Sequence, residues 1–120
     1  MDAPTTNKNV REFRELKVCM SSERNRRKLA LFVHGERETT VSTGPLRLLW
    51  RLIEFPGVVL PYLMLHDVLR TFRTREKARQ MITQYSTELN AMLRDLDVTV
   101  IITVAKDYGI ALCEVRRDSS

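Results

Sequence analysis

Polar and apolar residues alternate in the first third of the chain, which is typical of β-strands because successive side chains of a strand point to opposite faces. Strands are expected at three segments, Leu16–Met20, Lys28–Val33 and Arg37–Val41. Between them, Ser21–Arg27 (SSERNRR) has turn composition, and His34–Gly35 supplies the glycine that a tight turn favours. We therefore expect an antiparallel meander over residues 15–42.

The middle of the chain changes to apolar residues spaced by three and four, which predicts helices. Ser42 or Thr43 can cap a first helix with Pro45 in its first turn, and Phe55–Gly57 (FPG) would end it. A second helix is expected from Pro61 to Leu69. The remaining segments are a polar connector at Arg70–Arg75 and a third helix from about Glu76 to Leu93. The expected core positions are Leu46, Leu48, Leu49, Leu52 and Ile53, then Leu65, Val68 and Leu69, then Ala78, Ile82, Leu89 and Leu93.

The last part of the chain returns to a strand pattern. Val98–Val104 (VTVIITV) and Ile110–Val115 (IALCEV) flank a short loop that ends at Gly109, as in a β-hairpin. A meander, three helices and a hairpin make an α+β domain with the plan of a winged helix-turn-helix. With 120 residues in all, we expect a single domain at residues 11–117, between disordered tails at 1–10 and 118–120.

The net charge of the chain is a weak indication of its function. The chain has 20 Lys and Arg against 15 Asp and Glu, and this net charge of +5 favours an anionic partner such as nucleic acid. Cys19 and Cys113 each lie in an apolar run and are expected to be buried free thiols, which fits a reducing cytoplasm. Charged residues interrupt every long apolar stretch, so we expect no membrane span.

No motif indicates an enzyme. His34 and His66 lack the neighbouring Cys, Asp or Glu residues of a metal site, and the chain has no phosphate loop or nucleophile motif. We therefore expect no catalytic residues, no metal and no cofactor.

Two stretches carry a family resemblance. Val41–Leu60 (VSTGPLRLLWRLIEFPGVVL) resembles the start of the OmpR/PhoB-type DNA-binding effector domain, which reads roughly Leu-Thr, a leucine-rich helix and then Pro-Gly. Val41 and Ser42 stand at the Leu-Thr position, and Pro56–Gly57 matches without a gap. Ile102–Leu112 (ITVAKDYGIAL) looks like the wing hairpin of that family. The resemblance covers about residues 13–116 and implies a stand-alone winged helix-turn-helix without a receiver domain.

The resemblance implies a sequence-specific transcriptional regulator of bacterial or phage type, bound to double-stranded DNA in the cytoplasmic nucleoid. Its third helix would enter the major groove, and its wing would reach the neighbouring minor groove. The basic stretch Arg70–Arg79 would hold phosphates at the start of the third helix. The residues expected to contact DNA are Arg73, Arg75, Lys77, Arg79, Gln80, Thr83, Gln84, Thr87 and Lys106.

A second set of residues is more apolar than one buried stripe requires, and it suggests a protein interface. This set comprises Trp50, Tyr62, Leu63 and Met64. It would serve a homodimer, RNA polymerase or another transcription factor, although additional core beneath the N-terminal sheet explains the same residues. The second half of the third helix lacks the basic residues of the family and carries Glu88. The alternative is therefore a winged-helix protein-interaction module that has lost DNA readout.

Overall fold

The computed structural model describes residues 9–23, 26–35, 37–65, 74–105 and 107–115. Over these residues the chain is an α+β protein with two antiparallel sheets and three helices. The tails expected at residues 1–10 and 118–120 lie outside the described residues, apart from residues 9 and 10, and Val10 already belongs to a strand.

The N-terminal sheet contains the expected meander. Its strands are β1 (Val10–Phe13), β2 (Leu16–Glu23), β3 (Arg26–Val33) and β4 (Arg37–Thr39), which pair in chain order. The hydrophobic pattern does not predict β1, because four residues that include Arg11 and Glu12 show too little alternation. This strand forms through its backbone pairing with β2.

The β2–β3 hairpin corrects the expectation of a turn over Ser21–Arg27. The ladder continues through Ser21 paired with Lys28 and extends to the pair of Glu23 with Arg26. Backbone hydrogen bonds form the ladder, and they tolerate polar side chains where a hairpin extends beyond the core. Turn composition therefore locates the hairpin but overestimates the length of its turn.

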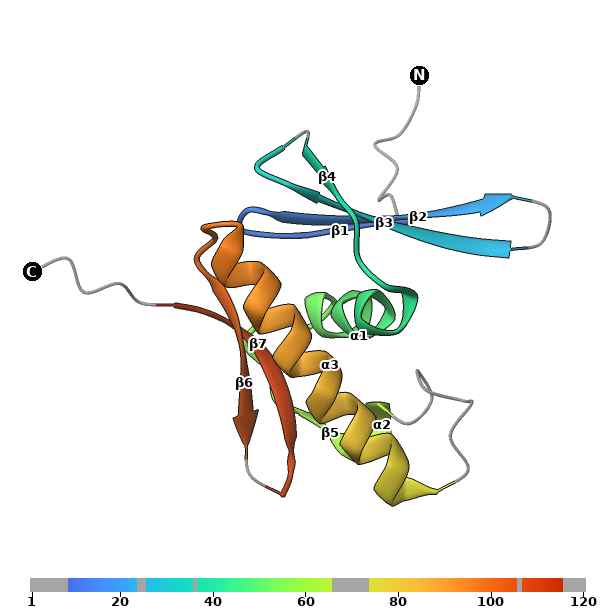
Figure 1. Ribbon diagram of the computed structural model, residues 1–120, viewed down its shortest axis with the longest axis vertical. Helices are drawn as coiled ribbons and strands as arrows, with labels where there is room; N and C mark the ends of the chain where they lie inside the picture. The colour runs from blue at the N-terminus through green and yellow to red at the C-terminus, as the bar shows by residue number, and fades with distance from the viewer. Residues whose placement is uncertain (1–8, 24–25, 36, 66–73, 106, 116–120) are drawn as a thin grey trace, which may run out of the picture.

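The inner face of this sheet packs on α1 (Thr43–Ile53), as Figure 1 shows. Alternate residues of β2 and β3 meet the leucine face of the helix, which confirms the expected core. The fully buried side chains at this junction are Leu16, Val18, Leu31, Val33, Leu48, Leu49 and Leu52. Ser42 takes the expected N-cap position, although its side chain makes no capping hydrogen bond.

The next two helices differ in length. α2 is described over Tyr62–Leu65, and the expected continuation to Leu69 lies outside the described residues. Pro61 does not open this helix, since it belongs to β5 (Leu60–Pro61), where it pairs with Gly109. α3 spans Arg75–Asp95, and Thr74 caps it by accepting a hydrogen bond from the Lys77 backbone N–H at 3.2 Å.

The core face of α3 matches its periodicity. The expected positions Ala78, Ile82, Leu89 and Leu93 are all buried, and Ser86 completes the row. The Ser86 hydroxyl donates to the Ile82 carbonyl at 2.8 Å, so this buried polar group is satisfied within the helix.

The C-terminal sheet has the strand order β5–β7–β6, with β6 at Val100–Ala105 and β7 at Gly109–Glu114. It confirms the expected hairpin, within two residues at each end. Gly109 is required at its tip, because a Cβ there would lie 1.9 Å from the Leu60 carbonyl oxygen. This order of elements is compatible with a winged helix.

In space, α3 begins at the end of the molecule opposite the N-terminal sheet and runs past α1 to that sheet, alongside the β6–β7 hairpin (Figure 1). The turn of the hairpin, α2 and the start of α3 therefore gather at one end. Among the described residues, none of the helices combines the length and apolar character needed to cross a bilayer.

Candidate nucleic-acid interface

The face of α3 that points away from the core is polar and exposed along most of the helix. Its exposed side chains include six of the predicted DNA-contacting residues, Lys77, Arg79, Gln80, Thr83, Gln84 and Thr87, and also Glu88. Because the apolar row of α3 is buried on the other side, this polar face is available to a ligand.

Local hydrogen bonds orient several of these side chains. The Thr83 hydroxyl donates to the Arg79 carbonyl at 3.0 Å, and the Thr87 hydroxyl donates to the Thr83 carbonyl at 3.1 Å. Each threonine therefore keeps its methyl group and its oxygen lone pairs for an external contact. The Gln84 amide donates to the Glu88 carboxylate at 3.4 Å, which pairs the two longest polar side chains of this segment.

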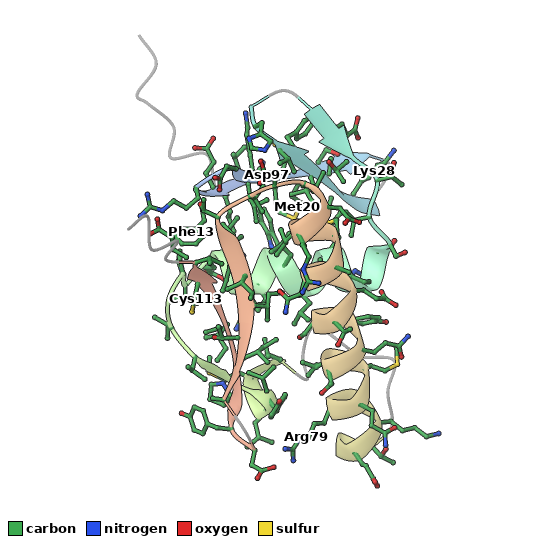
Figure 2. The ribbon with its side chains drawn as sticks, turned by 60° about the vertical axis from the view of Figure 1, so that its left-hand side comes forward. Phe13, Met20, Lys28, Arg79, Asp97 and Cys113 are labelled. Atoms are coloured by element: carbon green, nitrogen blue, oxygen red, sulfur yellow. The ribbon has the colours of Figure 1, made fainter. Side chains whose placement is uncertain are left out.

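Arg79 links three elements at the hairpin end of the molecule, where Figure 2 labels it. Its Nη2 donates to Oδ1 of Asp107, in the hairpin turn, at 2.5 Å. Its guanidinium carbon lies 4.9 Å from the centre of the Tyr62 ring, a cation–π contact with α2. The hydrogen bond with Asp107 raises the pKa of Arg79 above its ordinary value, so the side chain stays charged.

Asn90 fixes the hairpin against α3, a structural role that the sequence pattern did not indicate. Its amide donates to the Ile102 carbonyl at 2.9 Å, and its side-chain oxygen accepts from the Ile102 N–H at 2.8 Å. These two bonds imitate a neighbouring strand on the outer edge of β6. The only sequence signal is an amide side chain one residue after the core position Leu89.

A second linkage holds the other end of α3. Oε1 of Glu15 accepts hydrogen bonds from the N–H and the hydroxyl of Thr99, at 3.1 and 2.9 Å. Nε2 of His34 lies 3.0 Å from the Leu96 carbonyl oxygen. Partial burial raises the pKa of Glu15, but the bonds from Thr99 and the charge of His34 outweigh it and lower the pKa overall. The turn after α3 is thereby tied to the N-terminal sheet.

The three remaining predicted DNA contacts are Arg73, Arg75 and Lys106. Arg73 and Lys106 lie outside the described residues, and Arg75 is the first residue of α3.

The predicted protein interface does not form one exposed patch. Leu63 and Met64 are 63% and 44% exposed, as an interface requires, but Tyr62 is buried beneath Arg79. Trp50 is half-buried because the guanidinium of Arg11 lies over its ring at 3.9 Å. The alternative left open by the sequence, additional core, therefore applies to these two rings, which pack under arginines.

Further apolar exposure at the hairpin escaped the sequence analysis. Val104 and Tyr108 are 56% and 57% exposed. The Tyr62 N–H donates to the Tyr108 carbonyl at 3.0 Å, which ties α2 to the hairpin turn. The alternating pattern of the strand gave no signal that its last apolar residue extends beyond the core.

The two cysteines are free, and both are half-buried rather than buried as expected. The Cys113 sulfur lies 3.4 Å from the Thr103 hydroxyl on the same face of the hairpin. Within the described part of the chain, no group of three or more His, Cys, Asp and Glu side chains comes close enough to hold a metal ion.

Comparison with known proteins adds no assignment, since no family model matches the chain and no curated protein matches its sequence.

Proposed function

We propose that the protein is a sequence-specific DNA-binding transcriptional regulator with a winged helix-turn-helix fold. In this proposal α3 enters the major groove of double-stranded DNA, and the β6–β7 hairpin is the wing. The observation that carries the proposal is a 21-residue helix with one uncovered polar face, flanked along its length by a hairpin.

The dimensions and chemistry of α3 support this role. At 1.5 Å per residue the helix is about 30 Å long, and a B-DNA major groove about 12 Å wide admits a helix. Gln80 and Gln84 offer amides that can pair with adenine, and the methyl groups of Thr83 and Thr87 can contact thymine.

Phosphate contacts would come from the hairpin end of the molecule. The first turns of α3 present Lys77 and Arg79 beside backbone N–H groups of the helix N-terminus, which favour anions. With Arg73, Arg75 and Lys106, about four phosphates would be neutralised. The logarithm of the binding constant would then fall with log salt at a slope of about −3 to −4.

The test is a fluorescence-anisotropy titration of duplex DNA at two salt concentrations. Changing Arg75 and Arg79 to alanine should weaken binding to every sequence and flatten the salt slope by about 0.9 per phosphate lost. Changing Gln84 to alanine should instead alter the preference between sequences, by about 1–3 kcal/mol. Arg14→Ala is the control, because Arg14 is an exposed arginine that pairs with Glu114 away from α3.

Salt-sensitive binding that survives the arginine substitutions would refute the assignment of this face. Absence of binding at low salt would refute DNA binding itself.

The second candidate function is a winged-helix module that binds a protein. It is favoured by the exposed pair Leu63 and Met64 and by the pairing of Gln84 with Glu88, which places a carboxylate on the face meant for DNA. A second copy of the chain, RNA polymerase or another transcription factor would be the partner. The two functions are compatible if α2 makes a homodimer while α3 binds DNA.

A further inference from the structure

We propose that Asp107 competes with DNA phosphate for Arg79, so that the hairpin lowers the DNA affinity of its own domain. This inference rests on the proposed function. It assigns to Asp107 a role opposite to that of the surrounding basic residues: it sets the affinity by holding the arginine in the unbound protein.

The hairpin turn holds Asp107 in place. Asp107 has a φ of 64°, in the left-handed region, and the Tyr108 N–H closes the turn by donating to the Ala105 carbonyl at 3.0 Å. The Tyr108 carbonyl in turn accepts from the Tyr62 N–H. The carboxylate is therefore fixed to the same end of the molecule as the start of α3.

Arg79 occupies the space between the helix and the hairpin. If α3 lies in the major groove and the hairpin in the neighbouring minor groove, the sugar–phosphate backbone between the grooves must pass through this space. Arg79 supplies a positive charge in this space, and its Nη2 lies 2.5 Å from Oδ1 of Asp107. A phosphate that approaches Arg79 therefore meets the carboxylate at close range.

The existing pair is weak enough to exchange. The side chains of Arg79 and Asp107 are 46% and 72% exposed. Ion pairs in such exposed positions contribute little free energy, because water screens the charges. The guanidinium of Arg79 also stacks on the Tyr62 ring, a second contact that would hold its position while its anionic partner changes. Arginine also has further N–H donors that can bind a phosphate.

The experiment compares Asp107→Asn with the unmodified chain in the anisotropy titration with random duplex DNA. Asparagine suits the left-handed conformation at this position, so the turn should be preserved. We expect Asp107→Asn to tighten binding by up to about fivefold, the range of an exposed ion pair, and to steepen the salt slope by about 0.9. Asp95→Asn is the matched control, since it removes the same charge at the far end of α3.

A second comparison uses Arg79→Ala. Competition for Arg79 requires that Asp107→Asn have little effect in the Arg79→Ala background. An equal tightening in both backgrounds would show a general charge effect and overturn the inference. Weakening by Asp107→Asn would also overturn it, because Asp107 would then orient Arg79 toward DNA.

The titration distinguishes a failure of the role of Asp107 from a failure of DNA binding itself. If the unmodified chain binds duplex DNA but Asp107→Asn leaves its affinity unchanged, only the role of Asp107 is refuted. If neither protein binds at low salt, DNA binding is refuted and the role of Asp107 with it.

Discussion

Arg11 joins β1 to the end of α1, so its removal should destabilise the fold. Its Nη1 donates to the Trp50 carbonyl at 2.7 Å and lies 3.2 Å from Oε2 of Glu54. Its guanidinium also lies 3.9 Å from the centre of the Trp50 ring. The Arg11 side chain is only 24% exposed. The pKa of Arg11 is lowered overall, because partial burial and the nearby charge of Arg51 outweigh the opposing effect of Glu54.

The magnitude follows from these contacts. A hydrogen bond from a charged donor contributes about 1.5–3 kcal/mol, and a partly desolvated cation–π contact about 0.5–2 kcal/mol. The ion pair with Glu54 adds at most about 1 kcal/mol, because both side chains retain solvent contact. These contributions overlap, so we expect Arg11→Ala to lower the free energy of unfolding by about 2–4 kcal/mol.

Urea denaturation followed by circular dichroism measures this loss. Arg14→Ala is the matched control, because Arg14 pairs with Glu114 at 52% exposure and should cost under about 1 kcal/mol. Arg11→Lys should fall between the two, since it keeps the charge but not the planar group over the ring. If Arg11→Ala and Arg14→Ala destabilise equally, the reasoning about Arg11 is wrong.

Two further predictions concern Glu15 and the α2 surface. Because the pKa of Glu15 is lowered in the folded state, its contribution to stability is present at neutral pH and is lost as the pH falls from the ordinary glutamate value through the lower folded one. The free energy of unfolding should therefore be lower for Glu15→Gln than for the unmodified chain at neutral pH, and this difference should disappear below the folded pKa of Glu15. A difference that stays constant with pH would exclude this linkage. Changing Leu63 and Met64 to aspartate should shift sedimentation from dimer to monomer, or abolish partner capture, without lowering the melting temperature, because both side chains are exposed. Unchanged association of the soluble double variant would exclude this surface as an interface.

Local pattern was sufficient for most of the regular structure. The spacing of Ala78, Ile82, Leu89 and Leu93 predicted both the existence of α3 and its buried face. The turn glycines and alternating strands located the hairpins, because helical and strand periodicities depend only on neighbouring residues. The α+β order of elements follows from these signals, apart from the short strands β1 and β5.

Tertiary structure alone decided which polar and aromatic side chains meet. Trp50 and Tyr62 have the composition of an interface, yet each packs beneath an arginine that comes from a different element. β1 exists because β2 offers it a partner strand, and its own pattern is too short to specify it.

The candidate site shows the same division. The sequence by itself determined a polar α3 with basic residues in its first turns and an apolar face that must be covered, since these properties depend on spacing along a single helix. It could not determine that Arg79 would meet Asp107, or that Asn90 would bond to the edge of β6. Those contacts join residues 28 and 12 positions apart, and they exist only because the packed core sets the path of the hairpin past α3.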